Sequence, residues 1–143
     1  MLFGKRKRVV KRILIVEDEP LTAFDNENMI REAGYEVVAT IDRYADAIAK
    51  LDEEEVDLIL SDVRLSGERS GIDVANAGRE RGIPVLFVTG NPPPNARELV
   101  MGCLLKPYND RTLKSALKAV DDRLAGRDAK PPKGLELYET TEG

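Results

Sequence analysis

The chain alternates short apolar runs with longer amphipathic segments, and this alternation constrains its fold more than any other feature of the sequence. Strands that alternate with helices along a chain indicate a parallel sheet covered by helices on both faces. The pattern repeats about five times, so we expect a single α/β domain built from βα units. The expected strands are residues 13–16, 35–40, 56–61, 84–89 and 102–105.

Local signals mark two helix starts, and prolines restrict a further helix. Pro20 is well placed at the first position of the helix after the first strand. Ser70 with Asp73 three residues later resembles a capping box, which predicts that a helix begins there. Residues 92–94 are all proline and must lie in a loop, so only residues 95–100 remain for the fourth helix. We therefore expect that helix to be short or irregular.

The composition disfavours several classes of function. The 143 residues include no histidine, which excludes serine–histidine and cysteine–histidine catalysis and a role as phosphohistidine donor. The net charge of −4 disfavours a general nucleic-acid binder, which would usually be basic. A single cysteine, Cys103, cannot form an intrachain disulfide and fits a reducing compartment. No apolar run approaches a membrane span and the basic start lacks the apolar stretch of a secretory signal, so we expect a cytoplasmic protein.

Charged and hydroxyl side chains stand where four of the expected strands end. Glu17 and Asp18 follow the first strand, and Asp62 follows the third. Thr89 ends the fourth strand, and Lys106 follows the fifth. The carboxyl ends of parallel strands meet at one edge of a sheet, where ligands bind in open α/β folds. We therefore expect these side chains to gather at that edge.

These residue types together favour phosphoryl transfer. Carboxylates in close quarters repel one another, and a hard divalent cation such as Mg²⁺ relieves the repulsion. Mg²⁺ and Lys106 can place positive charge on the oxygens of a transferred phosphoryl group, and the Thr89 hydroxyl can donate to a third oxygen. Asp62 is then the candidate nucleophile that forms an acyl phosphate. Each residue alone has an ordinary structural explanation, but their joint placement favours a site.

Residues 11–126 resemble the response-regulator receiver family. The matching motifs are VEDEP at 16–20, LSDVRL at 60–65, VTG at 88–90 and KP at 106–107. Each motif is weak alone, but all four occur in order and each lies at the end of an expected strand. The resemblance implies a flavodoxin-like, doubly wound sheet of five parallel strands in the order 2-1-3-4-5.

By position, the resemblance implies a role for each acidic residue. Asp62 becomes the phosphoacceptor, and Glu17 and Asp18 become the acidic pair that holds Mg²⁺ together with Asp62. The backbone carbonyl of Arg64 becomes a further metal ligand. Such a receiver takes its phosphoryl group from a phosphohistidine on a sensor histidine kinase or a phosphotransfer protein.

The resemblance also makes Thr89 and Lys106 the residues that contact the phosphoryl group. It implies a cis peptide bond between Lys106 and Pro107. Arg64 and Asn91 each lie two positions after a key residue. By analogy with the family they face the reactive centre, where such positions tune the lifetime of the acyl phosphate.

The chain departs from the common receiver pattern three positions before the lysine. The family usually has an aromatic switch residue there, and this chain has Cys103, which we expect to be a small buried side chain. Tyr108 is a second switch candidate, although packing beside the last helix is the favoured role. Residues 84–90 resemble the Pro-Phe-x-Phe-Ala-Thr-Gly signature of a subfamily that tends to lack the aromatic, although Val85 and Val88 differ from it. Many members of that subfamily are single-domain regulators paired with alphaproteobacterial sensor kinases.

Two terminal segments flank the receiver domain, which we place at residues 12–126. Residues 1–11 form a basic arm that we expect to be solvated, with contact to an acidic kinase or a membrane surface as the weaker alternative. Residues 127–143 form a C-terminal tail too short for an output domain. Its apolar stretch 135–138 could dock on this domain or on a partner, although a loose tail is the favoured interpretation.

The leading hypothesis is a stand-alone phosphoacceptor of two-component signalling, acting as an adaptor or as a phosphate sink. It would not be an enzyme beyond its own phosphorylation and dephosphorylation. Its partners would be the kinase and a downstream protein, with no nucleic acid and no membrane span. The alternative is a pseudo-receiver that binds proteins unphosphorylated, because the aromatic is missing and the loop after Asp62 is one residue longer than usual. An aspartate-nucleophile phosphatase is disfavoured because the first strand lacks a D-x-D motif.

Overall fold

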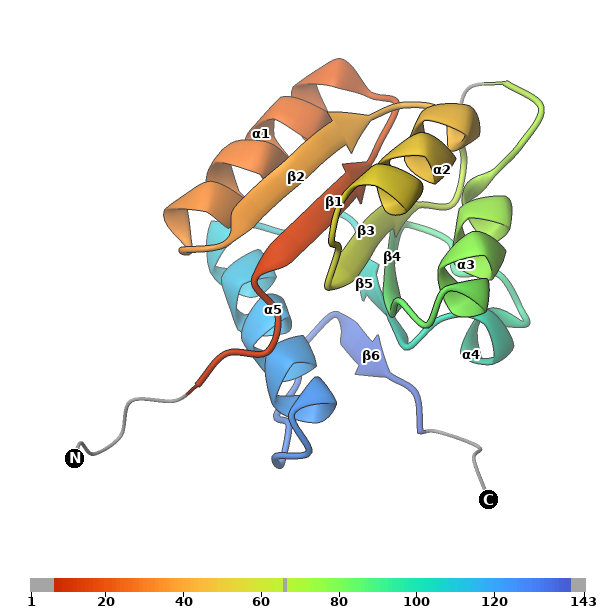
Figure 1. The fold of residues 1–143 in the computed structure, drawn as a ribbon. Helices are drawn as coiled ribbons and strands as arrows, with labels where there is room; N and C mark the ends of the chain where they lie inside the picture. The colour runs from red at the N-terminus through yellow and green to blue at the C-terminus, as the bar shows by residue number, and fades with distance from the viewer. Residues whose placement is uncertain (1–6, 66, 140–143) are drawn as a thin grey trace.

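The protein forms a six-stranded sheet in the order β2-β1-β3-β4-β5-β6 in a computed structural model, which describes residues 7–65 and 67–139 (Figure 1). The first five strands in the chain pair in parallel, and β6 pairs antiparallel with β5. The expected parallel sheet and its strand order are confirmed, and one further strand extends it. The strands are β1 Arg12–Val16, β2 Glu36–Ile41, β3 Leu58–Asp62, β4 Val85–Thr89, β5 Gly102–Leu105 and β6 Leu135–Leu137.

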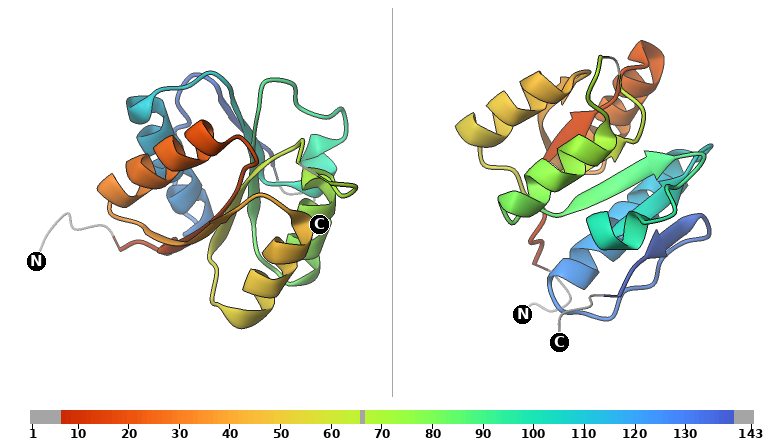
Figure 2. Two further views of the ribbon diagram at one scale, coloured as in Figure 1. Left: turned by 90° about the horizontal axis from the view of Figure 1, so that it is seen from above. Right: turned by 90° about the vertical axis from the view of Figure 1, so that its right-hand side faces the viewer.

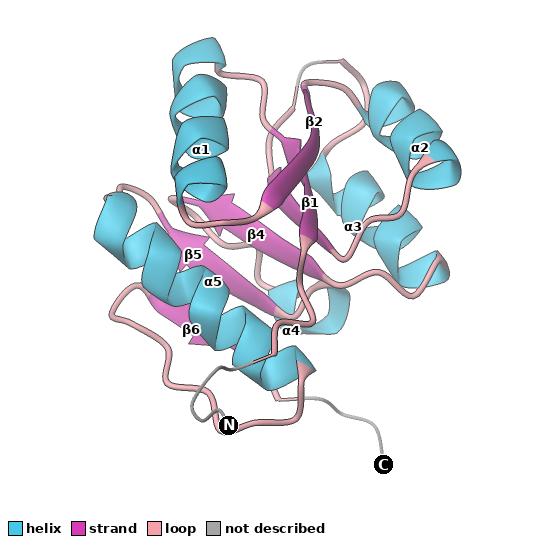
Figure 3. Ribbon diagram, turned by 60° about the vertical axis from the view of Figure 1, so that its left-hand side comes forward, coloured by secondary structure: helices cyan, strands magenta, loops and turns pink. Residues whose placement is uncertain are grey.

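Helices cover both faces of the sheet, as expected for a doubly wound fold (Figures 2 and 3). One face carries α1 and α5, and the other carries α2, α3 and α4. The helix α4 has only four residues, which confirms the expected short fourth helix. The helices are α1 Pro20–Glu32, α2 Tyr44–Glu53, α3 Gly71–Glu80, α4 Ala96–Leu99 and α5 Asp110–Leu124. None of the helices in the described part of the chain is long and apolar enough to cross a membrane.

The central strand β1 shows how the two-sided core is built. Ile13 and Ile15 pack in the cluster under α1 and α5, whereas Leu14 and Val16 pack in the cluster under α2 and α3. Successive side chains of a strand point to opposite faces, so a strand with helices on both sides must be apolar throughout. This requirement explains why the strands appear in the sequence as continuous apolar runs.

The expected capping box forms at the start of α3. The hydroxyl of Ser70 accepts a hydrogen bond from the backbone N–H of Ile72 at 3.1 Å, and the Asp73 carboxylate accepts one from the backbone N–H of Ser70 at 2.8 Å. Two N–H groups at the helix start are thereby satisfied. At α1, the side chain of Glu19 caps the helix, and Pro20 occupies its first position as expected.

The C-terminal segment corrects the expectation of a loose tail. Leu135 and Tyr138 are buried, and β6 pairs with β5 so that Gly102 lies opposite Leu137. The strands approach closely because Gly102 has no side chain: a Cβ atom at this position would collide with the backbone oxygen of Glu136. Residues 135–138 of the tail are therefore part of the sheet and its core.

The end of the N-terminal arm also packs against the domain rather than being solvated. The backbone N–H groups of Val9 and Val10 both donate to Oδ1 of the buried Asp121 at 2.8 Å. The Arg8 guanidinium lies 4.1 Å from the centre of the Tyr35 ring. The expectation of a solvated arm is therefore wrong for residues 8–10, and residues 1–6 lie outside the described part of the chain.

Candidate phosphoacceptor site

The sheet brings the expected site residues to one edge, beyond the carboxyl ends of its parallel strands. Glu17 and Asp18 directly follow β1, and Asp62 is the last residue of the neighbouring β3. Thr89 ends β4, and its backbone oxygen accepts a hydrogen bond from the N–H of Lys106 at 3.0 Å. The residues at this edge therefore come from four adjacent strands of one rigid sheet.

Asp62 is held by contacts to both of its carboxylate oxygens. Its Oδ1 accepts a hydrogen bond from the backbone N–H of Val63 at 2.7 Å, and its Oδ2 accepts one from Nζ of Lys106 at 3.1 Å. The side chain keeps 14% of its surface exposed, so it is accessible from solvent. Gly71, at the start of α3, lies against the Asp62 backbone so closely that any Cβ atom would collide with the carbonyl oxygen of Asp62. This glycine lets the start of α3 pack directly against the backbone of Asp62 and Val63.

Glu17 is the most buried acid of the site, with 4% of its surface exposed. Its Oε1 accepts a hydrogen bond from Nζ of Lys106 at 3.2 Å, and its Oε2 accepts one from the backbone N–H of Glu19 at 3.0 Å. Burial raises the pKa of Glu17, and the negative charge of Asp62 raises it further. The contacts with Glu19 and Lys106 lower this pKa but do not cancel the effect.

Lys106 joins the two carboxylates through a single ammonium group. Burial by itself lowers the pKa of Lys106, but the hydrogen bond to Asp62 and the charge of Glu17 outweigh it, so the pKa is raised. The lysine therefore stays protonated at neutral pH, as a fixed positive charge between Glu17 and Asp62. Such a charge can stabilise a phosphoryl group that is transferred to Asp62.

Three carboxylates at this edge are close enough to share one metal ion. Oxygen atoms of Glu17, Asp18 and Asp62 all lie within 4.8 Å of one another. Carboxylate oxygens suit Mg²⁺, whose ligands lie about 2.1 Å from the ion, so these side chains fit with a small closing movement. Arg64, expected to add its backbone carbonyl, lies exposed in the loop between β3 and α3.

Thr89 and Asn91 form a small turn beside this cluster. Thr89 is buried, and its Oγ1 accepts a hydrogen bond from the backbone N–H of Asn91 at 3.1 Å, so the hydroxyl bonds within its own loop rather than to Asp62. Asn91 is exposed. The sheet therefore places Thr89 at the expected edge. Among residues 7–65 and 67–139 its hydroxyl donates no hydrogen bond, so the proton can be donated to a ligand.

The two switch candidates point into opposite faces of the domain. Tyr108 packs against the core beneath α1 and α5, and its hydroxyl donates to Oδ1 of the buried Asn26 at 2.6 Å. Burial raises the pKa of Tyr108 to about 12. Cys103 is buried in the core beneath α2, α3 and α4, which confirms the expected small buried side chain. The peptide bond between Lys106 and Pro107 is cis, as expected.

The sequence did not predict that Tyr138 lies next to Cys103. Tyr138 directly follows β6, and its hydroxyl donates to Sγ of Cys103 at 3.3 Å. An aromatic ring thus lies next to Cys103, the position where receivers usually carry an aromatic residue, but it is supplied by the residue that follows β6. The only signal in the sequence was the apolar stretch that contains it.

A family model described as the response regulator receiver domain matches residues 13–118. The chain belongs to the response regulator receiver family. The match spans β1 through most of α5, and so contains every residue of the acidic edge.

Relatives of this receiver carry it within longer chains. The transcriptional regulatory protein PdtaR of Mycobacterium tuberculosis is 32% identical over 124 residues, which cover 80% of this chain and 58% of PdtaR. The response regulator PhyR from Brucella abortus has a crystal structure that matches with a TM-score of 0.62 and 31% identity, over 76% of this chain and 46% of PhyR. This chain therefore spans about half the length of these relatives.

One solved receiver is similar over nearly its whole length. The receiver domain of the sensor histidine kinase PA1611 from Pseudomonas aeruginosa matches with a TM-score of 0.67 and 26% identity, over 82% of this chain and 99% of that one. Its structure is described as having a magnesium ion coordinated in the active site cleft. The acidic edge of the present receiver has the oxygen ligands that such an ion requires.

Proposed function

We propose that this receiver accepts a phosphoryl group on Asp62 from a phosphohistidine of a sensor kinase or phosphotransfer protein, in a reaction that requires Mg²⁺. One observation carries the proposal: Nζ of Lys106 lies 3.1 Å from Asp62 and 3.2 Å from Glu17, within a trio of carboxylates. A lysine that only forms a surface salt bridge would contact one carboxylate. Lys106 instead contacts two, one of which is the buried Glu17, and Asp18 lies beside them.

The chemistry assigns a separate task to each residue. A carboxylate oxygen of Asp62 attacks the phosphorus atom, the bond from phosphorus to the donor imidazole breaks, and its electron pair returns to the imidazole nitrogen. The ammonium group of Lys106 donates a hydrogen bond to one oxygen of the transferred phosphoryl group, and the Thr89 hydroxyl donates to another. Mg²⁺, when bound by Glu17, Asp18 and Asp62, supplies charge neutralisation for the incoming group. The Val63 N–H keeps the other oxygen of Asp62 in place throughout.

The surface beside the acidic edge suits a protein donor. Leu21 and Phe24 lie on α1, close after the acidic pair, with 74% and 64% of their surfaces exposed. Large apolar side chains this exposed are unusual on a free surface when they lie together, and they mark contact sites. We propose that the donor packs on this part of α1 and so positions its phosphohistidine over Asp62.

The test is intact-mass spectrometry after mixing the protein with a small phosphodonor and Mg²⁺. We expect the mass of one phosphoryl group to be added, to require Mg²⁺, and to be absent in Asp62→Asn. The matched control is Asp128→Asn, which changes an exposed acid of the C-terminal segment and should leave phosphorylation intact. If the small donor does not react, the cognate kinase is used instead.

The same experiment decides between the proposed outputs. An acyl phosphate that forms fast and decays fast indicates a phosphate sink, and a long-lived one indicates an adaptor that signals through contacts of its own surface. No mass increase with either donor, while the protein is folded and binds Mg²⁺, would refute the proposal and favour a pseudo-receiver that works unphosphorylated.

A further inference from the structure

A groove lies at the amino-terminal ends of β4 and β5, on the side of the sheet remote from the acidic edge. It consists of two hollows of about 230 and about 710 Å³. The hollows are continuous because five residues line both of them: Arg79, Ile83, Pro84, Val100 and Met101. Thr89 lies four residue steps along β4 from Val85, which lines the smaller hollow. This distance of about 13 Å separates the groove from the acidic edge, so the groove is not part of the candidate phosphoacceptor site.

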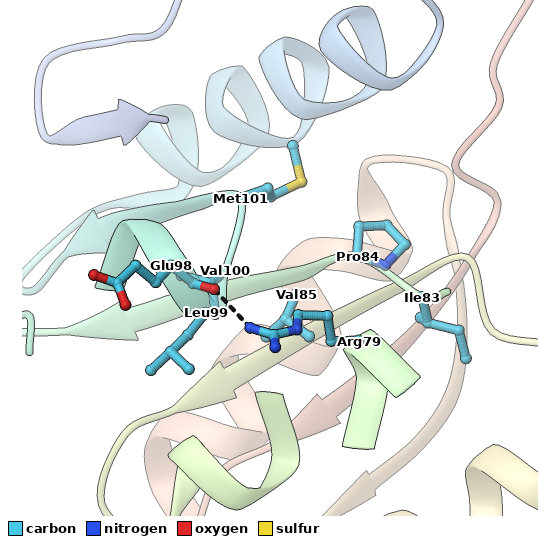
Figure 4. Close-up of a pocket in the computed structure, with 8 residues that line it drawn as sticks. All are labelled: Arg79, Ile83, Pro84, Val85, Glu98, Leu99, Val100 and Met101. Atoms are coloured by element: carbon cyan, nitrogen blue, oxygen red, sulfur yellow. Dashed lines mark hydrogen bonds between the residues drawn. The ribbon is translucent and has the colours of Figure 1, made fainter. Parts of the chain in front are cut away.

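The floor of the groove is apolar and partly open to solvent. Figure 4 shows the apolar residues that line the smaller hollow: Ile83, Pro84, Val85, Leu99, Val100 and Met101. The larger hollow adds Leu124, which is 39% exposed at the end of α5, and the ring of Tyr138. An apolar floor of this kind favours a ligand that brings apolar side chains of its own.

Three arginines from three helices border the floor. Arg79 comes from α3, Arg97 from α4 and Arg123 from α5. Arg79 donates to the backbone oxygen of Glu98 at 2.8 Å, and in Figure 4 the Glu98 carboxylate points away from the guanidinium. Arg123 donates to the backbone oxygen of Tyr138 at 2.9 Å, and Arg97 lies 5.4 Å from the centre of the Tyr138 ring.

Within residues 7–65 and 67–139, none of these three guanidinium groups forms an ion pair with a carboxylate. Other arginines of the chain do: Arg81 pairs with Asp52, and Arg127 pairs with Asp121. A guanidinium has five N–H donors, and the groove arginines use few of them. The groove therefore combines unused, carboxylate-matching donors with an apolar floor.

We propose that this groove binds an acidic, partly apolar segment of a partner protein. Carboxylates of such a segment would bond to the arginines in the bidentate geometry that the planar guanidinium favours. Its apolar side chains would cover Val100, Met101 and Leu124. A nucleic acid fits less well, because its bases would meet a floor with a single aromatic ring and a chain of net charge −4.

The test measures the fluorescence anisotropy of a labelled peptide made of glutamate and leucine. We expect saturable binding that weakens with added salt, because it depends on charge. Arg97→Gln should weaken the affinity about tenfold, since a charge-assisted hydrogen bond is lost. Leu124→Glu should weaken it similarly, by placing a negative charge on the floor. Arg111→Gln, an exposed arginine in the first turn of α5, is the matched control and should leave the affinity unchanged.

Several outcomes would overturn the proposal. The proposal fails if neither the wild type nor any variant binds the peptide saturably. It also fails if Arg97→Gln and Arg111→Gln weaken the affinity for the peptide equally. Equal affinity for a peptide of glutamate and glycine would show that the apolar floor is not used. Tighter Arg97-dependent binding of a single-stranded oligonucleotide, or self-association of the receiver through this groove in sedimentation, would assign the groove to another ligand. Circular dichroism of each variant verifies the fold.

Discussion

The hydroxyl of Tyr138 donates a hydrogen bond to Sγ of Cys103 across 3.3 Å and so links the C-terminal segment to β5. Both side chains are buried in the core beneath α2, α3 and α4. Many receivers place an aromatic side chain on β5 itself. Here a small side chain stands on β5, and a ring supplied by the residue after β6 occupies the neighbouring space.

Both the hydroxyl and the ring of Tyr138 should contribute to the free energy of unfolding. We expect Tyr138→Phe to lower the free energy of unfolding by about 1 kcal/mol, because one hydrogen bond is lost. Tyr138→Ala should lower it by about 3 kcal/mol, because a buried ring is removed as well. Urea denaturation measures both changes. Equal effects of the two substitutions would mean that the ring does not contribute to the packing.

The thiol of Cys103 should be unreactive in the folded protein. Burial raises the pKa of Cys103, although the hydrogen bond from Tyr138 lowers it in part, so little of the reactive thiolate forms at neutral pH. We expect iodoacetamide at pH 8 to modify the folded protein at least about tenfold more slowly than the urea-unfolded chain. Tyr138→Ala should speed the reaction. Rapid modification of the folded wild type would contradict the burial.

The same raised pKa predicts a pH dependence of stability. The unfolded thiol ionises near its ordinary pKa of 9.0, whereas the folded thiol keeps its proton to higher pH. The folded state therefore binds more protons between these values, and the free energy of unfolding falls as pH rises through that window. Urea curves at pH 7 and pH 10 should show a larger decline for the wild type than for Cys103→Ala. An equal decline would assign the effect to other groups.

The Glu17 carboxylate should strengthen Mg²⁺ binding without stabilising the fold of the metal-free protein. Burial raises the pKa of Glu17, so its charge is costly, and Glu17→Gln keeps a side-chain oxygen for the Glu19 N–H. We expect Glu17→Gln to keep the free energy of unfolding in EDTA or to raise it by about 1 kcal/mol, while Mg²⁺ affinity falls at least about tenfold. Glu32→Gln, at an exposed position of α1, should change neither quantity. Marked destabilisation in EDTA would contradict this account.

Gly71 should tolerate no side chain. A Cβ atom there would collide with the carbonyl oxygen of Asp62, which is backbone and cannot move aside as a side chain would. We expect Gly71→Ala to lower the free energy of unfolding by about 2 kcal/mol or more and to reduce phosphorylation of Asp62. Gly90→Ala is the matched control for stability, because a Cβ atom there meets open space. Thermal unfolding followed by circular dichroism compares the two variants.

Much of the fold and site could be predicted because the signals are local. The buried strands are continuous apolar runs, and the acidic, hydroxyl and lysine residues stand where those runs end, so parallel topology alone brings them together. The capping box at Ser70 and the prolines at 92–94 act on adjacent residues. The strand order, however, came from the family resemblance rather than from the residues themselves.

The features that were missed depend on contacts between distant residues. β6 has only three residues, and its pairing depends on Gly102, where the lack of a side chain admits the Glu136 backbone. Asp121 looks like one more charge on an amphipathic helix, yet it is fully buried and holds Val9 and Val10. No pattern within either segment indicates the partner.

The last two turns of α5 hold both terminal segments, with Asp121 bonded to Val9 and Val10, and Arg123 bonded to the backbone of Tyr138. Figure 1 shows both segments running on the side away from the arrowheads of β1 and β2. Asp62 ends β3, which runs parallel to β1, and so lies on the side of the arrowheads. A receiver immobilised on a sensor surface through a tether that follows on from either of these segments would therefore present its acidic edge to the solution. Donor binding could then be followed without the tether standing in its way.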